Sequence, residues 1–528
     1  MGTVPGGEGA AEGVGGTADI RDRTCVIVPF SAAATVRLTV RARDATVFAV
    51  SHELYRRASS AVPEEVDVDL RVAEGALPPD LRGVLYRNGP GTNASWGTPY
   101  LHPFDGDGHV VRFAFDGARV RYRNRFVATR EREEEARLKR PVYRSFGTNL
   151  PGGLRKNLFR TTFKNAANTS VVWHGGKLLA LWEGGLPHRL DPETLATFGR
   201  DDYGGRLRNA GSALDRMLAP ELPFSAHPKI DPGTGELFNF GALFGPKPTL
   251  LLHRASAAGE LDVPVRLPMD RLVFLHDFVL TPHYLVFFLV PVAFRVAPTL
   301  IGLVPPADAI EALDGEPTRI LLVPRAGGAP RSFEASPCFV FHFAAAHEEP
   351  DGRVVVVGLR MPSFPSSAQL RALFDGSGGD FPSAIPTRTT IDPASGRVRE
   401  ERLDDGPAEL PTIDPRRVGL RTRFFWSIAG APRDPDPFLT HVQRFDLDGG
   451  RTVRRDFAPD LPGEPVFVPD PDGEEGTGYA LVLVYRAREH RSDLFVLRAD
   501  DLRTVCRLEL PHPVPLGFHG TWVSSPAA

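Results

Sequence analysis

Four of the fifteen histidines stand out by their sequence context. Each follows apolar or small residues where a predicted strand ends: His227 in FSAHPKIDP, His276 in FLHDF, His342 in CFVFHF and His519 in PLGFHGTW. A neutral imidazole is a common metal ligand, and a carboxylate on its other nitrogen would hold the ring in place. The alternative is a core histidine bonded to a backbone carbonyl, because a buried imidazole needs partners for both nitrogens. The sequence contains no HExxH or CxxC spacing that would decide between the two interpretations.

Three glutamates lie in apolar or proline-rich sequence rather than in a run of charges. Glu183 ends the strand-like segment KLLALWEGG, Glu409 lies in AELPTIDP and Glu464 lies in GEPVFVP. A buried carboxylate is costly unless it is paired, so we expect each to bond either an imidazole or one of the many arginines. The run EREEEARLKR, residues 131–140, is dense in charge and instead predicts a solvated helical or loop face.

The elements that would position these side chains are short strands. Apolar runs such as KLLALWEG, RVVVVGLRM and ALVLVYRA are separated by turns that begin at Asp191, Asp231 and Asp392. In such turns Asp caps the turn, Pro fixes φ and Gly takes the left-handed conformation. Long helical periodicity is scarce. Many short strands at near-even spacing predict an all-β fold, either a β-propeller or a large sandwich.

The composition bounds the partners and the compartment. The chain has 528 residues and a net charge of −3, with no basic stripe, so we do not expect it to bind nucleic acid. Three cysteines without a pairing pattern indicate a reducing compartment. No apolar run reaches the ~20 residues that a membrane-spanning helix needs. We therefore expect a cytoplasmic protein, at most peripheral at the membrane surface. Residues 1–60 are predicted to form a flexible leader, and residues 61–528 a single domain.

Nine segments occur in a defined order between Glu74 and Trp522. They are LYRNGPG, HPFDGDGHVVRFAF, RYRNRFV, NAANTSVVWHGGKLLALWEGGLPHRLDPETLATFG, FSAHPKIDP, FLHDFVLTPHYLVFF, FVFHFAAAHEE, GEPVFVP and PLGFHGTW. Together they resemble the carotenoid cleavage oxygenase family, most closely its bacterial apocarotenoid oxygenases. No single motif carries the resemblance, and its specificity comes from the agreement of all nine in order.

The resemblance implies a seven-bladed β-propeller with a helical and loop dome over a metal face. One non-haem Fe(II) per chain would lie on the propeller axis, held by the four histidines: His227, His276, His342 and His519. The three glutamates would each accept a hydrogen bond from a ligand imidazole: Glu183, Glu409 and Glu464. His227 would be the ligand without such a partner. Neutral imidazoles suit iron, and an incomplete octahedron leaves room for O2 as co-substrate.

One segment departs from the family pattern. The usual FHxxNAxE reads FHFAAAHE at residues 341–348, with Ala345 where Asn is common and His347 before the acid. His347 is close enough to His342 in sequence to compete as the ligand. The pair Phe341–His342 matches the family, so His342 is the predicted ligand. The effect of Ala345 on the packing or hydrogen bonding behind the ligand is left open.

The implied activity is O2-dependent cleavage of one C=C bond of a carotenoid or apocarotenoid into two carbonyl products. A second interpretation within the family is cleavage of a stilbene. A phenolic substrate needs polar groups in the pocket; Lys164 is available, but residues 129–140 contain no tyrosine to help it. An apolar polyene is therefore preferred. A third interpretation, from a different class, is a propeller that only binds partners.

The substrate path is predicted from apolar residues. Phenylalanine is abundant, with 34 copies against five tryptophans, and the expected tunnel-lining residues are Phe274, Phe278, Phe287, Phe341 and Trp426. The apolar stretch 285–306 could contact the membrane that supplies the substrate, or it could be a packed strand followed by a covered loop. The sequence does not indicate an oligomeric state.

Overall fold

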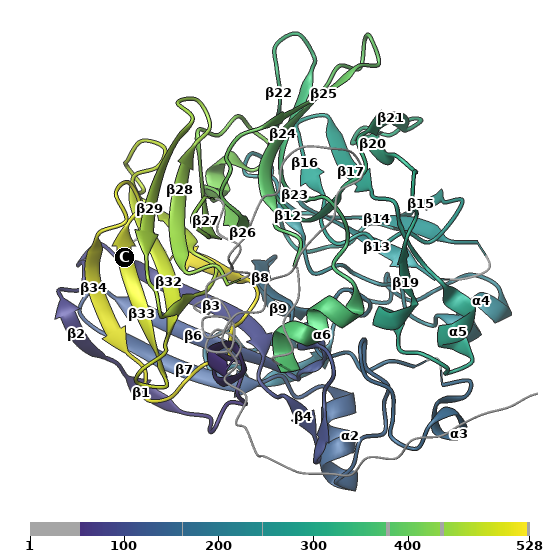
Figure 1. Ribbon diagram of the computed structural model, residues 1–528, viewed down its shortest axis with the longest axis horizontal. Helices are drawn as coiled ribbons and strands as arrows, with labels where there is room; N and C mark the ends of the chain where they lie inside the picture. The colour runs from purple at the N-terminus through teal and green to yellow at the C-terminus, as the bar shows by residue number, and fades with distance from the viewer. Residues whose placement is uncertain (1–52, 161, 245–246, 376–380, 433–437, 525–528) are drawn as a thin grey trace, which may run out of the picture. The chain divides into compact units, whose positions relative to one another are not determined.

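Seven antiparallel sheets surround a common centre and form a β-propeller (Figure 1). The computed structural model describes residues 53–160, 162–244, 247–375, 381–432 and 438–524. These described residues form one compact unit. The predicted seven-bladed all-β fold is confirmed.

Five of the seven sheets are built from strands taken in chain order, with one separate two-stranded sheet inserted within the third. The first holds β8 (Ser170–His174), β9 (Lys177–Leu181), β10 (His188–Leu190) and β11 (Thr197–Arg200). The second holds β12 (Lys229–Ile230), β13 (Leu237–Leu243), β14 (Thr249–Ala255) and β15 (Val265–Pro268). The third holds β16 (Val279–Leu280), β17 (Tyr284–Leu289), β20 (Thr318–Pro324) and β21 (Arg331–Ala335). The fourth holds β22 (Phe339–Glu348), β23 (Val354–Met361), β24 (Ile385–Ile391) and β25 (Val398–Arg402). The fifth holds β26 (Ala408–Thr412), β27 (Phe424–Ala429), β28 (His441–Asp446) and β29 (Arg451–Asp456).

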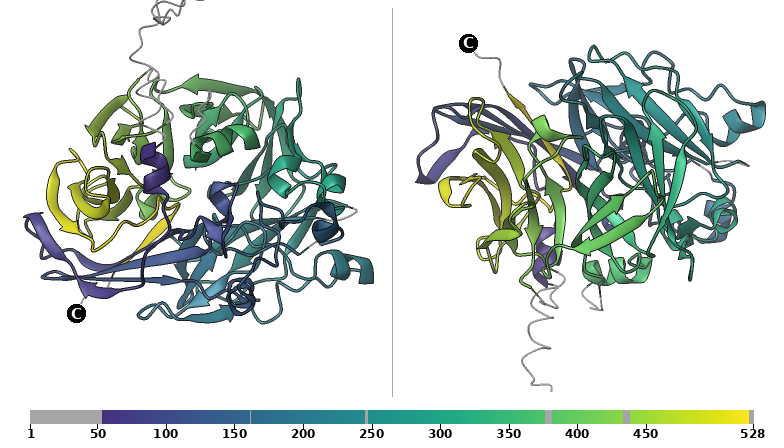
Figure 2. Two further views of the ribbon diagram at one scale, coloured as in Figure 1. Left: turned by 60° about the horizontal axis from the view of Figure 1, so that its bottom comes forward. Right: turned by 90° about the horizontal axis from the view of Figure 1, so that it is seen from above.

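The other two sheets combine strands from both ends of the chain and close the ring. One has the order β1 (Asp67–Asp69), β7 (Val120–Phe126), β6 (Gly108–Asp116), β3 (Arg82–Pro90), β35 (Gly520–Ser524). The other has the order β2 (Arg71–Gly75), β34 (Thr504–Glu509), β33 (Arg491–Arg498), β32 (Gly478–Arg486), β30 (Leu461–Pro462), and β31 (Val466–Pro469) also pairs with β32. Figure 2 shows the yellow C-terminal strands beside the purple N-terminal ones from two further sides.

Several strands are apolar throughout because neighbouring sheets cover both of their faces. In β23 six of the eight residues in succession, Val354–Leu359, are buried. A strand with one solvated face would alternate apolar and polar residues, whereas a strand between two packed sheets does not. Phe339, Val356 and Leu359 share one such core with residues of the preceding sheet. This packing explains why the sequence showed wholly apolar runs.

Short helices and two small hairpins occupy the connections. They are α2 (Arg130–Leu138), α3 (Leu154–Asn157), α4 (Ala213–Leu218), α5 (Val296–Leu300), α6 (Ser367–Asp375), the 3-10 turns η1 (Pro103–Asp105), η2 (Pro306–Ala309) and η3 (Pro415–Arg417), and the hairpins β4 (Ala94–Ser95) with β5 (Thr98–Pro99) and β18 (Val292–Phe294) with β19 (Ile310–Ala312). Ser367 and Arg371 of α6 both bond Asp308 of η2, at 2.6 and 2.7 Å, which joins separate connections into one cap. Within the described residues, no helix is both long and apolar enough to cross a membrane.

Helix α2 corrects one expectation about residues 131–140. The segment is helical, and Thr129 caps it by accepting a hydrogen bond from the Arg132 amide at 3.1 Å. It is not a fully solvated face, because Glu131 and Glu135 are buried. Their carboxylates are paired with Arg200 and Lys164, cations that lie far away in sequence and that charge patterning alone could not reveal.

The predicted leader is described only at its end. Residues 53–58 are helical, and Ala58 packs in a core with Phe438, Leu461 and Tyr485. The compact unit therefore includes residues that the sequence assigned to the leader. The remainder of the predicted leader, residues 1–52, lies outside the described residues.

Candidate metal centre

Each of the seven sheets contributes one of the seven polar residues expected to build the site. His227 precedes β12, His276 precedes β16, His342 lies in β22 and His519 precedes β35. Glu183 follows β9, Glu409 lies in β26 and Glu464 lies between β30 and β31. The propeller brings them together because the inner edge of every sheet faces the same centre. Their large separation in sequence is a direct consequence of this fold.

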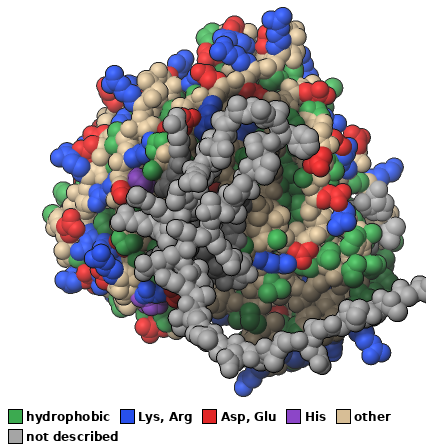
Figure 3. All heavy atoms as spheres, in the orientation of Figure 1, with side chains coloured by type: hydrophobic (Ala, Val, Ile, Leu, Met, Phe, Trp, Pro, Cys, Tyr) green, Lys and Arg blue, Asp and Glu red, His purple; other side chains and the backbone are tan. Residues whose placement is uncertain are grey.

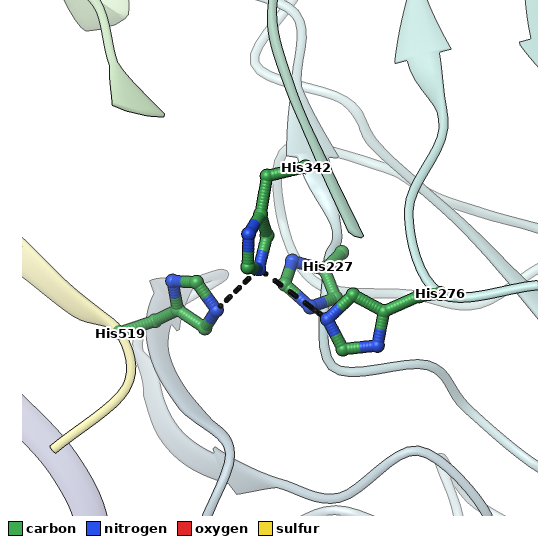
Figure 4. Close-up of side chains that lie close together, drawn as sticks. All are labelled: His227, His276, His342 and His519. Carbon is green, nitrogen blue, oxygen red and sulfur yellow. Dashed lines mark hydrogen bonds between the residues drawn. The ribbon is translucent and has the colours of Figure 1, made fainter. Parts of the chain in front are cut away.

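The four histidines converge on one point (Figure 4). Their candidate ligand atoms all lie within 4.8 Å of one another. Successive Nε2 atoms are 3.0 Å apart from His227 to His276, 3.3 Å from His276 to His342 and 3.2 Å from His342 to His519. Nitrogens bound at right angles to one metal at about 2.1 Å would be about 3 Å apart, so this spacing suits a shared ion.

Each of the three glutamates places a carboxylate oxygen close to a ring nitrogen of a histidine. Glu409 Oε2 lies 2.6 Å from Nδ1 of His342, and Glu464 Oε1 lies 2.9 Å from Nδ1 of His519. Glu183 Oε1 lies 3.3 Å from Nδ1 of His276 and 3.5 Å from Nε2 of His227. Glu464 is anchored further, because it accepts a hydrogen bond from the Gly520 amide at 2.8 Å and pairs with the buried Arg87.

The carboxylates determine which nitrogen of each ring is free. An ionised carboxylate can only accept, so Nδ1 of His342 and of His519 carries the proton. Each Nε2 then presents a lone pair to the centre. Lone pairs placed this close repel one another unless a cation lies between them. The donor set therefore fits a metal ion.

Burial keeps most of the cluster uncharged. Burial lowers the pKa of His227 and of His276 well below the usual value for imidazole, and the neighbouring histidines add to the effect. Burial also lowers the pKa of His519, against the opposing influence of Glu464. Burial acts in the same direction on His342, but Glu409 outweighs it and raises the pKa of this ring. Neutral imidazoles are the form that binds metals.

Asp277 links the ligands and was not singled out as a site residue from the sequence. It is buried, and its Oδ1 lies 2.8 Å from Nζ of Lys229, two residues after His227. Its Oδ2 accepts a hydrogen bond at 3.1 Å from the amide of Phe343, the residue after His342. One carboxylate therefore joins the segments of three ligands. The signal in the sequence was an acid directly after His276, followed by an apolar strand.

The structure distinguishes His342 from His347. His342 lies in the cluster, whereas His347 bonds Glu349 at 3.2 Å, further along β22. Ala345 is buried in a small core with Val357 and Phe425. The residue that differs from the family pattern is therefore packed by apolar neighbours.

The aromatic residues expected to line a tunnel divide into two groups. Phe274 and Phe341 contact the His276 ring, with centroid distances of 6.3 and 5.3 Å. Three others lie apart from these rings: Phe278, Phe287 and Trp426. Each is completely buried between sheets and exposes no surface to a tunnel. Phe278 stacks on Phe287, and Trp426 stacks on Phe467 and donates to a backbone carbonyl. They belong to the core because apolar strands are covered on both faces.

Lys164 lies in a second buried cluster. Its Nζ is 2.8 Å from both Glu135 Oε2 and Asp107 Oδ1, and it donates to the Tyr100 hydroxyl at 2.9 Å. A tyrosine does accompany Lys164, but it comes from residue 100 rather than from residues 129–140. Two carboxylates already bind the ammonium group. Lys164 is therefore not a free donor for a substrate.

Comparison with known proteins agrees with this architecture. The family model described as retinal pigment epithelial membrane protein matches residues 59–524. The apocarotenoid-15,15'-oxygenase of Synechocystis sp. is 36% identical, over 89% of this chain and 96% of its own. The isoeugenol monooxygenase of Pseudomonas putida is 31% identical, over 86% and 94%. The carotenoid cleavage dioxygenase 7 of Oryza sativa subsp. japonica, a chloroplastic protein, is 31% identical, over 86% and 88%.

Solved structures give the same result. The crystal structure of cobalt-substituted Synechocystis apocarotenoid oxygenase superimposes with a TM-score of 0.82 at 35% identity, covering 90% of this chain and 99% of the other. The match extends over nearly the whole propeller rather than over one motif. The chain belongs to the carotenoid cleavage oxygenase family.

Proposed function

We propose that this chain is a non-haem Fe(II) dioxygenase that cleaves one C=C bond of an apocarotenoid or carotenoid with O2, giving two carbonyl products. The observation that supports it is the convergence of four Nε2 atoms in a member of this family. The proposed ligands are the four histidines named above. When bound, iron would supply the one-electron chemistry with O2 that none of these side chains can perform.

The roles proposed for the side chains follow from their contacts. Glu409 and Glu464 fix the proton on Nδ1 of their histidines and so aim Nε2 at the metal. Glu183 Oε1 lies 3.3 Å from Nδ1 of His276 without a hydrogen-bond partner among the described residues, and its proposed role is to orient that ring. Phe274 and Phe341 form an apolar wall against His276 that excludes water and can hold a flat polyene in place.

The apolar surroundings favour a polyene over a phenol. Lys164, the donor considered for a phenolic substrate, is bound by Glu135 and Asp107. A stilbene remains the alternative substrate within the family, and a relative named isoeugenol monooxygenase is 31% identical to this chain. The two classes differ in the polar groups they need, so they can be separated by direct assay.

A panel assay tests the proposed function. The protein, purified with iron, is incubated in air with apocarotenals of several lengths and with hydroxystilbenes, and the aldehydes formed are identified by mass spectrometry. We expect about one iron per chain and cleavage of an apocarotenal. Iron-loaded protein that cleaves only stilbenes would replace the polyene by the alternative. Protein that folds without metal and cleaves neither class would refute the enzyme assignment.

We also propose a membrane contact, at a narrower place than the stretch 285–306. Residues 285–290 are buried in the blade and offer no surface. Exposed apolar side chains instead lie on two neighbouring connections: Leu154, Leu158, Phe159, Ile301 and Leu303. Figure 3 shows hydrophobic side chains gathered around α5. Exposed cations next to them, such as Arg155 and Lys156, would favour an anionic lipid surface.

Arg144 holds the two connections together. Its fully buried guanidinium donates to the carbonyls of Arg160, Thr299 and Val304 at 2.7–2.9 Å. Gly302 packs so closely on Asn157 that an added Cβ would lie 2.3 Å from that backbone. The apolar side chains therefore form one fixed patch rather than two independent loops.

Substitution of Ile301 and Leu303 by glutamate tests the patch. We expect binding to vesicles of phosphatidylcholine and phosphatidylserine to fall about tenfold or more, because the apolar contact is replaced by charge. Val453→Glu, on the outer strand β29, is the matched control and should leave binding unchanged. Equal vesicle binding by the double variant and the parent protein would remove the patch from consideration.

A further inference from the structure

The four proposed ligands are not all held in the same way. Asp277 joins the segments of three of them, through Lys229 and the amide of Phe343. Within the described residues, none of its hydrogen bonds or ion pairs reaches the fourth ligand, His519. His519 precedes β35, which is the edge strand of its sheet and pairs there with β3. The fourth ligand therefore needs a support of its own.

Hydrogen bonds of the backbone hold the segment before β35. The Asn88 amide donates to the His519 carbonyl, and the Phe518 amide donates to the Asn88 carbonyl, both at 2.9 Å. These bonds fix the main chain, but an imidazole can still rotate about its side-chain bonds. The partner that orients the ring is Glu464, whose Oε1 lies 2.9 Å from Nδ1 of His519. The direction of the ligand nitrogen thus depends on what holds Glu464.

Arg87 of β3 contacts both the glutamate and the segment of the ligand. Its Nη1 donates to the carbonyl of Glu464 at 2.7 Å and lies 3.4 Å from Oε2 of the same residue. Its Nη2 donates to the carbonyl of Phe518 at 3.4 Å. The guanidinium is planar and offers several donors in a fixed geometry. One side chain therefore ties the glutamate to the residue before His519.

This support distinguishes Glu464 from the other two glutamates. Within the described residues, Glu183 and Glu409 form ion pairs with histidines alone. The side chains of Arg87 and Glu464 are only 3% and 5% exposed. Removing one partner of a buried ion pair leaves the other charge uncompensated, which is costly. The arginine and the glutamate therefore hold each other in place beside the ligand.

Gly520 provides the space that Arg87 occupies. It follows His519 and lies opposite Arg87 in the pairing of β3 with β35. A Cβ on Gly520 would lie 2.9 Å from Cγ of Arg87 and 2.6 Å from the carbonyl oxygen of Tyr86, closer than real Cβ contacts. Its amide donates to Oε2 of Glu464 at 2.8 Å. A glycine after the ligand therefore lets the arginine pass directly beside it.

We infer that Arg87 is a positioning residue of the metal centre, which holds Glu464 so that Nε2 of His519 points at the other three histidines. Arg87 touches neither the metal nor the substrate and acts through the glutamate. The inference goes beyond the proposed ligand set and rests on it, since it takes His519 as a ligand. An arginine that only stabilised the fold would raise the melting temperature without determining how the metal is bound.

Metal binding by variants of Arg87 tests this role. The probe is Co(II), because its affinity is measured by competition with a chelator and its visible absorption reports the number and arrangement of ligands. Arg87→Met should lower the affinity about tenfold or more and change the absorption, because one imidazole is no longer aimed at the metal. Arg87→Lys keeps the charge and should have intermediate affinity. Adding Arg87→Met to Glu464→Gln should cause no further loss, because the arginine acts through that glutamate.

Arg144→Met is the matched control. Arg144 is also fully buried, but its guanidinium bonds Asn149 and backbone carbonyls rather than a glutamate of the centre. This variant should lower the melting temperature and leave the Co(II) affinity and absorption of the folded protein unchanged. The same pattern in Arg87→Met overturns the inference, and so does an equal loss of affinity with and without Glu464→Gln. If Arg87→Met does not fold, Arg87→Lys takes its place in both comparisons, with a smaller loss expected.

A measurement on the metal-free protein separates this inference from the proposed function. The proton on Nδ1 of His519, bonded to Glu464, should give a downfield signal in the proton NMR spectrum, identified by its loss in His519→Ala. We expect Arg87→Met to shift or remove this signal and to leave that of His342, which bonds Glu409. A parent protein that binds neither iron nor Co(II) would refute the proposed function, while the NMR signal would still decide the role of Arg87. An unchanged His519 signal in Arg87→Met overturns the inference.

Discussion

The four-histidine centre and the Lys164 cluster are both buried groups of ionisable side chains. The Lys164 cluster is complete, because its charged groups pair with one another, whereas the histidine centre is incomplete. Lys164 is surrounded by two carboxylates and a hydroxyl. Glu135 in turn accepts from Ser95 and from the Val142 amide, each at 3.0 Å. In the histidine centre, Nε2 atoms face one another at 3.0–3.3 Å with carboxylates fixing their protons elsewhere. A buried polar cluster that satisfies itself holds the fold together, whereas one that does not is built for a ligand.

Removal of one ligand should break the incomplete cluster as a functional site. We expect His276→Ala to lower iron below about a tenth of an equivalent and turnover by on the order of a thousandfold, because several kcal/mol of barrier reduction depend on the metal. Metal analysis and product formation measure both effects. His347→Ala is the matched control, since that histidine bonds Glu349 outside the centre. Full iron and turnover in His276→Ala would overturn the ligand assignment.

Removal of the cation should break the complete cluster in a different way. Lys164→Met leaves Glu135 and Asp107 buried without their partner, which we expect to cost about 3–5 kcal/mol in the free energy of unfolding. Denaturant unfolding measures the loss, and iron per folded chain should stay unchanged. Arg353→Met, which breaks an exposed pair with Asp351, should cost below about 1 kcal/mol. A loss of iron at unchanged stability would mean that Lys164 serves the metal centre.

The contrast also explains what could be predicted from the sequence. The histidines and glutamates were identified from context and from nine ordered segments, and the propeller followed from the same resemblance. The wholly apolar strands indicated the fold but not which of their phenylalanines would be exposed. Phe278 and Phe287 pack in a core between sheets, whereas Phe274, only four residues before Phe278, contacts the His276 ring. That distinction depends on packing between sheets, which no local pattern contains.

Contacts between residues distant in sequence are the second feature that the sequence could not predict. Glu135 lies in a run of charges that looks solvated, and its partner is 29 residues away. Asp277 was visible beside His276, but its contacts come from Lys229 and from the amide of Phe343. His102 lies within one of the nine segments, yet only the fold shows that its buried Nε2 has no hydrogen-bond partner among the described residues. A sequence identifies a polar residue, and the fold decides whether it is satisfied.

Asp105 is an intermediate case, a buried carboxylate whose hydrogen-bond donors among the described residues are the neutral Gly147 amide and Thr148 hydroxyl. Burial raises its pKa from 3.8 to about 6. Because the folded-state pKa exceeds the unfolded one, the stability contributed by protonation is full below about pH 4 and is lost as the pH rises through 6. We therefore expect the stability of the parent protein relative to Asp105→Asn to fall by about 2–3 kcal/mol between pH 4 and pH 7. Denaturant unfolding at several pH values measures it, and a difference independent of pH would contradict the raised pKa.

The smallest effect should come from Glu409, a carboxylate that bonds one histidine of the incomplete cluster but does not face its centre. Glu409→Gln keeps the size of the side chain but replaces the strong acceptor at 2.6 Å from His342 with a weaker neutral one. We expect metal affinity to fall about 10–100-fold, with the fold and some activity retained. Competition with a chelator measures the affinity, and Glu349→Gln, which alters the partner of His347, is the control. An affinity loss as large as that of His276→Ala would mean that Glu409 itself binds the metal. Unchanged metal affinity would mean that the proton stays on Nδ1 of His342 without Glu409. The seven sheets alone would then hold the Nε2 lone pairs in position.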